Sequence, residues 1–110
     1  MAPGDSTPGR RRVPHPAGLL PNDLEPGDYW YVEHVPSIGR PAVFFLPPTA
    51  LAGAAGAYER SIRWLPEPPH IIRLEPDTTI TVTGPIAIPT DQHGRGGWRG
   101  DLTAGVWREA

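Results

Sequence analysis

The side chains of this sequence that could carry chemistry include four histidines and, of its three serines, Ser37. Imidazole can bind a metal ion or act as a base, yet no two of the histidines have the helical spacing of a metal site. Ser37 lies three residues after a histidine, on an expected turn, and a nucleophile needs such a base beside it in space. This spacing favours surface or structural histidines, so we expect no metal and no cofactor. The histidines are His15, His34, His70 and His93.

The glycine-rich stretch of residues 94–97 is the second candidate. It lacks the Gly-Lys-Ser/Thr ending and the strand-to-helix context of a phosphate-binding loop, so a hairpin connection is favoured. Arginine forms planar bidentate contacts, and tryptophan offers a stacking face for a nucleotide or an acidic peptide. A core position for Trp98 is the alternative. The residues expected to bind at this loop are His93, Arg95, Trp98 and Arg99.

Composition limits the functions open to the chain. With 110 residues there is room for one domain and a modest core, and without cysteine the chain forms neither disulfides nor a cysteine-ligated zinc site. The net charge of -2 gives no general attraction to nucleic acid or to an anionic membrane. All ten basic residues are arginine, and alanine, glycine and proline are abundant, which is typical of a GC-rich genome such as that of an actinobacterium or its phage.

The first part of the chain carries no targeting signal that we can identify. Prolines interrupt every apolar stretch of signal-peptide length, and no segment approaches the roughly 20 apolar residues of a membrane span. Residues 1–24 are rich in proline, glycine and arginine and predict a flexible tail, followed by a single small β domain over residues 25–110. The tail includes Arg10-Arg11-Arg12, which is typical of a solvated charge run, with contact to phosphate or to an acidic partner as the alternative.

Short strands are expected to position the candidate residues. Residues 28–35 are rich in aromatic and β-branched side chains, and residues 41–46 form an apolar run typical of a strand covered on both faces, so together they predict a hairpin. Further strands are expected over residues 61–65 and 70–74, separated by prolines that remove ladder donors. Residues 49–58 are compatible with a weak helical turn or with a mobile loop.

The last third of the chain alternates like a half-buried strand. Ile80 and Val82 are expected to point inward between outward threonines, and Gly84-Pro85 predicts a bulge or an edge. The final strand is expected around residues 102–107, with a possible turn at Ala104-Gly105. The fold class that follows is all-β, a small antiparallel barrel or sandwich of about six short strands with a disordered N-terminal tail.

The block from Ile80 to Trp107 resembles a family of small phage and bacterial proteins. In that family a strand ending in Pro-Ser-Ile or Gly-Ser-Ile precedes a Gly-Trp-His-Gly-x-Leu segment and a terminal Gly-Val-Trp-like strand. The family looks related to the BubE-like serine peptidases, which implies the serine as nucleophile and the histidine as base. Here Pro85 stands at the serine and Arg99 at the histidine, so the resemblance implies a scaffold, with a peptide-binding groove, that lacks this activity.

A second resemblance lies in the first half of the chain. Residues 26–33 followed by residues 40–45 look like the opening hairpin of the MazF-type endoribonuclease toxins, which have an SH3-like barrel. That resemblance implies Arg40 as a catalytic candidate. Ala87 stands where the Pro-Ile-Thr motif of those toxins has its threonine.

We therefore expect a non-catalytic protein-binding or accessory protein of an actinobacterial phage or prophage, with a protein partner. Contact with a membrane or with nucleic acid is not expected, and the expected location is the cytoplasm of the host cell or the virion. The alternatives are a MazF-like endoribonuclease toxin and a minor virion structural protein. The apolar strand at residues 43–46 fits a dimer interface as well as a monomer core.

Overall fold

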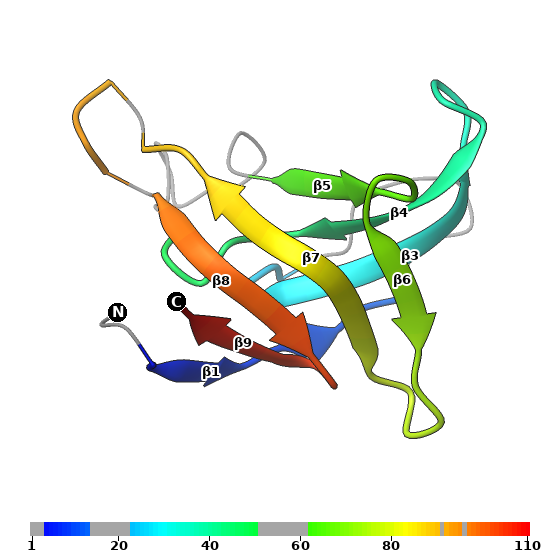
Figure 1. Ribbon diagram of the computed structural model, residues 1–110, viewed down its shortest axis with the longest axis horizontal. Coiled ribbons are helices and arrows are strands. Elements are labelled where there is room, and N and C mark those ends of the chain that lie inside the picture. Colours follow the sequence, from blue (N-terminus) through cyan, green and yellow to red (C-terminus); the bar gives the residue numbers. More distant parts are fainter. Residues whose placement is uncertain (1–3, 14–22, 51–61, 91, 96) are drawn as a thin grey trace.

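A computed structural model describes residues 4–13, 23–50, 62–90, 92–95 and 97–110. Within these ranges the chain forms β-strands and no helix, which confirms the predicted all-β fold class (Figure 1). Most of the stretch 49–58, expected as a helical turn or loop, lies outside the described residues. The strands are β1 (Ser6–Pro8), β2 (Arg10–Arg11), β3 (Asp28–Val35), β4 (Arg40–Phe45), β5 (Arg63–Pro66), β6 (Ile71–Leu74), β7 (Ile80–Ile88), β8 (Trp98–Thr103) and β9 (Val106–Glu109).

The described strands form two sheets that pack into one globule. One sheet has the order β1-β9-β8-β7-β6 and the other the order β2-β3-β4-β5. All pairings are antiparallel except that of β2 with β3, which is parallel, so the second sheet is mixed. The hairpin expected over residues 28–35 and 41–46 is β3 and β4. The expected final strand is two strands, β8 and β9, which join at the Ala104-Gly105 turn.

The alternation read from the sequence of β7 is present in the structure. Ile80 and Val82 are buried. The pairing then becomes irregular, because three residues of β7 lie between Val82 and Ile86, whereas one residue of β8 lies between their partners Leu102 and Gly100. Gly84 lies in this irregular stretch with a φ of 106°, a conformation that favours glycine. The expected bulge at Gly84-Pro85 is therefore confirmed, and the apolar face resumes at buried Ile86.

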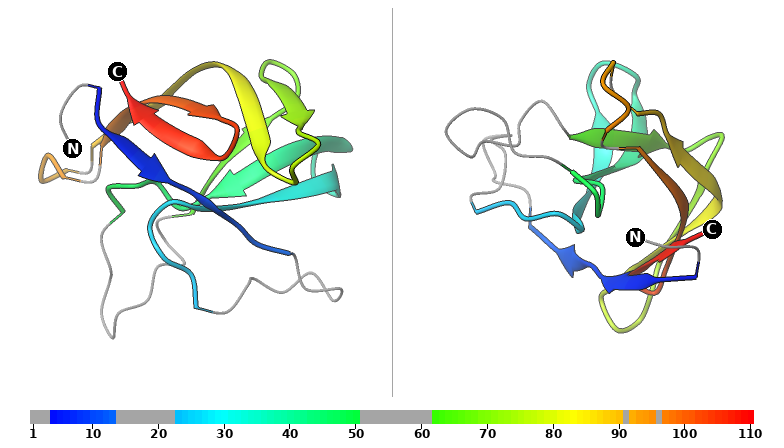
Figure 2. Two further views of the ribbon diagram at one scale, coloured as in Figure 1. Left: turned by 90° about the horizontal axis from the view of Figure 1, so that it is seen from below. Right: turned by 90° about the vertical axis from the view of Figure 1, so that its left-hand side faces the viewer.

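Residues 4–13, expected in a flexible tail, pair with both sheets. β1 pairs with β9 and β2 pairs with β3, so the segment passes from one sheet to the other (Figure 2). The crossing point is Gly9, where an added Cβ would lie 2.8 Å from the carbonyl oxygen of Gly105 and 2.9 Å from Nε1 of Trp107. Only glycine fits there. Residues 1–3 and 14–22 of the expected tail lie outside the described residues.

Two of the three arginines of this segment, Arg10 and Arg12, bind one buried carboxylate. Asp28 is 2% exposed and accepts from Arg10 at 3.1 Å (Nε) and 2.9 Å (Nη2), and from Arg12 at 3.1 Å. Arg11 donates to the carbonyl oxygen of Thr78 at 2.7 Å. Composition does not reveal these contacts, because the acceptors lie far from the arginines in sequence.

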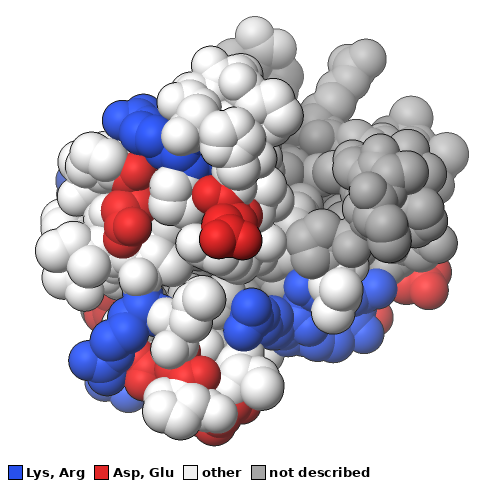
Figure 3. All heavy atoms as spheres, turned by 90° about the vertical axis from the view of Figure 1, so that its right-hand side faces the viewer, with Lys and Arg blue, Asp and Glu red and all other residues white. Residues whose placement is uncertain are grey.

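Charge is spread over the face of the molecule that Figure 3 shows. Basic and acidic side chains lie interspersed there, separated by uncharged residues. This arrangement agrees with the small net charge of -2. Among the described residues, no helix is long and apolar enough to cross a membrane.

Trp107 lies at the centre of the core between the sheets. Its ring centroid is 5.1 Å from that of Phe45, 5.6 Å from that of Trp98 and 6.3 Å from that of Tyr29. Its indole nitrogen donates to the carbonyl oxygen of Gly27 at 2.7 Å, which satisfies the one polar atom of the side chain. The strand at residues 43–46 contributes to the core of the single chain through buried Val43, Phe45 and Leu46.

We predict that Asp28→Asn weakens the attachment of residues 4–13. The substitution removes the charge that binds two arginines, and hydrogen bonds to charged groups contribute about 1.5–3 kcal/mol, so we expect urea unfolding to show a loss of about 2 kcal/mol. Hydrogen exchange should accelerate at the amides of Gly9 and Arg12, which bond to Gly105 and Tyr29. Asp101→Asn, at an exposed carboxylate, is the matched control. Equal stability of the two variants would contradict the prediction.

We also predict a loss of stability at alkaline pH that depends on Tyr29. Burial raises the pKa of its hydroxyl above the ordinary value of 10.0, against a smaller opposite effect of a hydrogen bond with the Ile80 backbone. The unfolded chain loses the proton first, so the contribution is fully present below pH 10 and is lost as pH rises through the folded-state pKa. Unfolding measured against pH should show a smaller alkaline loss in Tyr29→Phe. An alkaline loss of stability in Tyr29→Phe equal to that of the unchanged protein would refute the prediction.

Candidate binding site

The structure separates the four residues expected to bind. His93 and Arg95 are exposed on the loop that joins β7 to β8, and residues 91 and 96 of this loop lie outside the described residues. Trp98 is 2% exposed, whereas its neighbour Arg99 is exposed. The alternative core position for Trp98 is therefore the one that the structure shows. Trp98 and Arg99 still line one shared depression, which His93 and Arg95 do not.

The alternation of β8 explains why these neighbours have different surroundings. Successive residues of a strand point to opposite faces, and β8 alternates between buried and exposed positions from Trp98 to Thr103. Trp98 pairs with Ile88 and Arg99 with Ala87 on β7. Gly100 follows on the buried face, where an added Cβ would lie 2.6 Å from the Trp98 ring. The glycine leaves the space that the indole occupies.

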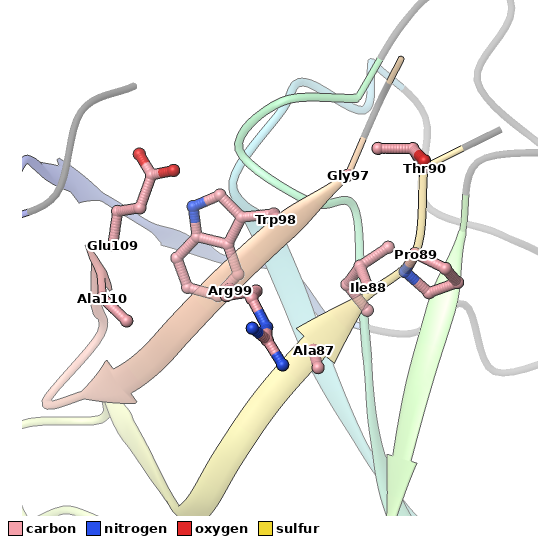
Figure 4. A pocket seen from close by; sticks show the side chains of 9 residues that line it. All are labelled: Ala87, Ile88, Pro89, Thr90, Gly97, Trp98, Arg99, Glu109 and Ala110. Carbon is pink, nitrogen blue, oxygen red and sulfur yellow. The ribbon is translucent and has the colours of Figure 1, made fainter. Parts of the chain in front are cut away.

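An open depression of about 540 Å³ lies where the end of β7, the start of β8 and the end of β9 meet (Figure 4). We call it the Trp98 depression. Its wall on β7 is apolar, and its polar side chains are Thr90 after β7, Arg99 on β8 and Glu109 on β9. The residues that line it are Ala87, Ile88, Pro89, Thr90, Gly97, Trp98, Arg99, Glu109 and Ala110.

The indole nitrogen of Trp98 is the most informative atom of this site. It is buried and has no hydrogen-bond partner within the described part of the chain. Buried donors are nearly always paired, because leaving one without an acceptor costs about 1–3 kcal/mol. In Figure 4 this nitrogen lies on the side of the depression where Glu109 stands. The indole of Trp107, by contrast, has its acceptor.

Arg99 supplies a positive charge at the same place. Its backbone carbonyl accepts from the amide of Ala110 at 3.0 Å, which fixes β8 against the end of β9. Its side chain is exposed, and no carboxylate of the described residues forms an ion pair with it. The guanidinium extends toward Ala87 in Figure 4. It can therefore receive a carboxylate or a phosphate without first losing a partner.

A second open depression, of about 450 Å³, lies over the irregular stretch of β7. Pro85 lines it, together with Asp101 and Thr103, whose hydroxyl donates to the Asp101 carboxylate at 3.1 Å. Pro85 and Arg99, which stand at the serine and histidine positions of the peptidase-like motif, thus line different depressions. The two depressions adjoin, because Ala110 lines both of them.

The remaining chemical candidates lie elsewhere. Arg40 is exposed at the start of β4, and the β3–β4 hairpin lies at the opposite end of the molecule from the β7–β8 loop in Figures 1 and 2. His70 lies beside the bulge, with Nδ1 3.3 Å from the position of a Cβ on Gly84. Within the described residues, no three histidine, aspartate or glutamate side chains gather to hold a metal ion.

Sequence reasoning missed the part of the depression that β7 and β9 contribute. Ala87 and Glu109 carry no motif, and they reach Trp98 and Arg99 only through the register of the sheet, in which Gly100 pairs with Glu109. Only the pairing of β8 with both β7 and β9 brings these residues together. The local sequence pattern of a strand does not reveal which strands it pairs with.

Comparisons of the chain with known protein families, with curated proteins and with solved structures find no match.

Substitutions of Trp98 and Arg99 should have different effects on the free energy of unfolding. Trp98→Ala opens a cavity beside Trp107 and should lower the free energy of unfolding by about 3–5 kcal/mol. Arg99→Ala should change it by less than about 0.5 kcal/mol, because an exposed side chain without a partner is removed. Urea unfolding followed by tryptophan fluorescence measures both. A large loss in Arg99→Ala would show that the arginine has a structural role.

Proposed function

We propose that this protein is a non-catalytic protein-binding or accessory protein of an actinobacterial phage or prophage, acting in the cytoplasm of the host cell. The observation that carries the proposal is the exposed Arg99 guanidinium on the rim of the Trp98 depression. Arginine is enriched at the residues that contribute most to protein interfaces, because its planar guanidinium combines charge, directional donors and apolar surface. Its place beside a largely apolar wall matches that pattern.

The residues at the motif positions support binding rather than catalysis. Proline at position 85 has no nucleophilic atom, and an arginine with a pKa above about 12 keeps its proton near neutral pH and is no general base. The two residues also line different depressions. A fold with these two residues retains a surface for binding and lacks the nucleophile and the base of a serine peptidase.

The charge of the molecule supports a protein partner over nucleic acid. Binding to a phosphate backbone draws on several arginines or lysines on one surface, whereas the net charge here is -2. Two of the arginines are already bound to Asp28. Arg99, the arginine that lines the Trp98 depression, fits one acidic group of a protein.

Affinity capture with two charge reversals tests the proposal. We predict that the tagged protein retains one host or phage protein from an actinobacterial lysate in near-equal amount. Arg99→Glu should reduce its recovery at least about tenfold, which corresponds to 1.4 kcal/mol, and Arg40→Glu should leave it unchanged. Circular dichroism of both variants checks the fold.

An RNA-integrity gel of the same expressing cells gives the opposing result. Degraded RNA with no retained protein, and recovery of intact RNA in Arg40→Glu, would replace the proposal by the endoribonuclease. Equal capture by the unchanged protein, Arg99→Glu and Arg40→Glu would support the binding function and show that Arg99 does not contribute to it.

A further inference from the structure

We infer that residues 4–13, which we call the strap, occupy a groove that also accepts an extended segment of a partner protein with the pattern Gly-Arg-x-Arg. The groove consists of one edge of β9 and one edge of β3, and the strap runs along both on the outside of the globule (Figure 2). The inference goes beyond the proposed function, because this groove does not involve the side chain of Arg99.

The strap contributes no apolar side chain to the core. All of its residues are exposed or half-buried, and its one aliphatic side chain, Val13, is 84% exposed. Main-chain hydrogen bonds hold it instead, among them those from Gly9 to Gly105 and from Arg12 to Tyr29, both at 2.7 Å. Segments with few buried apolar contacts open at a low cost in free energy. The strap can therefore leave the groove while the core stays folded.

Asp28 requires that any segment in the groove carries a cation. Among the described residues it is the only charged residue that is buried, with 2% of its surface exposed. A buried carboxylate without a positive partner is costly in free energy. Arg10 meets it with two donors, Nε at 3.1 Å and Nη2 at 2.9 Å, and Arg12 adds a third at 3.1 Å. Two parallel donors from one group are a geometry of arginine that lysine does not reproduce.

The crossing between the two edges requires glycine. At Gly9, an added Cβ would lie 2.8 Å from the carbonyl oxygen of Gly105. It would also lie 2.9 Å from Nε1 of Trp107 and 2.9 Å from Cε1 of Tyr29, which are rings of the core. The two arginines that bind Asp28 stand one and three positions after this glycine. The groove therefore selects the pattern Gly-Arg-x-Arg.

The sheet edges add contacts that do not depend on the sequence of the bound segment. The amide of Glu109 on β9 donates to the Asp5 carbonyl oxygen at 2.9 Å, and β3 pairs in parallel with the part of the strap that carries the arginines. Addition of an extended peptide to a sheet edge is a recurring mode of recognition, in which side-chain contacts provide the specificity. Asp28 and the narrow space at Gly9 provide it here.

The strap competes with such a partner. Because it belongs to the same chain, it is present at the groove at an effective concentration on the order of 1 mM. A segment that lacks the glycine or the arginines forms fewer contacts and does not displace it. A substitution that removes the strap from the groove should therefore increase the affinity for a matching segment in solution.

Fluorescence anisotropy on the full chain tests the inference with the labelled peptide acetyl-Gly-Asp-Ser-Thr-Pro-Gly-Arg-Arg-Arg-Val-amide, which has the sequence of residues 4–13. Gly9→Ala keeps the strap out of the groove by collision and leaves the groove itself unchanged. We predict that this variant binds the peptide at least about tenfold more tightly than the unchanged chain does. Gly94→Ala, where nothing lies within 4 Å of an added Cβ, is the matched control and should give no gain.

Variant peptides separate specific binding from general attraction between charges. Alanine in place of the second glycine of the peptide keeps the charge and should weaken binding to the Gly9→Ala chain at least about tenfold, because its methyl group meets the same atoms. Lysine at the peptide positions of Arg10 and Arg12 also keeps the charge and should weaken binding about two- to fivefold.

A second variant tests the same point without a change at the crossing. Arg10→Ala/Arg12→Ala releases the strap by removing both of its ion pairs with Asp28 and should also raise the affinity for the peptide. Arg40→Ala/Arg63→Ala, at two exposed arginines outside the strap, loses the same charge and is its control. Circular dichroism checks the fold of every variant, and this pair replaces Gly9→Ala if that chain does not fold.

Three results would overturn the inference. The first is an affinity for the peptide that neither release of the strap increases. The second is equal binding of the peptides with glycine and with alanine at the crossing, which would show attraction between charges alone. The third is a dimer of the unchanged chain that the peptide disrupts, because a second copy and not a partner protein would then fill the groove.

Discussion

The close approach of three backbone segments around Trp107 is the constraint on which the rest of the structure depends. The chain crosses between the sheets at Gly9, turns between β8 and β9 at Gly105, and enters β3 after Gly27, and each of these glycines contacts the same indole or the backbone beside it. A side chain at Gly9 would collide with the Gly105 carbonyl and the Trp107 ring, and one at Gly105 would lie 2.8 Å from the Tyr29 hydroxyl. Trp107 fills the space and bonds to the Gly27 carbonyl. The two sheets thus share one centre.

That centre also sets the geometry of the candidate site. Trp98 meets Trp107 edge to face, at an interplanar angle of 88°, so its ring cannot turn without disturbing the core. The orientation of the indole nitrogen toward the depression follows from this packing. Arg99 is then directed outward by the alternation of β8. The buried ring and the exposed guanidinium belong to consecutive residues of β8 and therefore point to opposite faces of the strand.

Sequence pattern predicted the parts of the fold that local chemistry determines. The aromatic run that became β3, the inward Ile80 and Val82, and the bulge at Gly84-Pro85 follow from periodicity and from the backbone preferences of glycine and proline. The N-terminal strands β1 and β2 were not predicted, because they form through contacts with Asp28 and through the crossing at Gly9. The depression was half predicted: Trp98 and Arg99 were named, while Glu109 joins them only through strand register. Contacts between distant segments leave no periodic signal.

The pairing of β1 with β9 has a consequence for the time course of biosynthesis. Ser6 lies opposite Arg108 in the sheet, so one of the first strands to be synthesised waits for one of the last. Until residue 108 has left the ribosome, β1 has no edge to join, and the segment that carries Gly9 has no ring of Trp107 to cover. Folding dominated by such distant pairings is slow, in the range of milliseconds to seconds. Ordering of β1 therefore has to follow the synthesis of β9, whereas the partners of Arg10 and Arg12 in β3 are synthesised early.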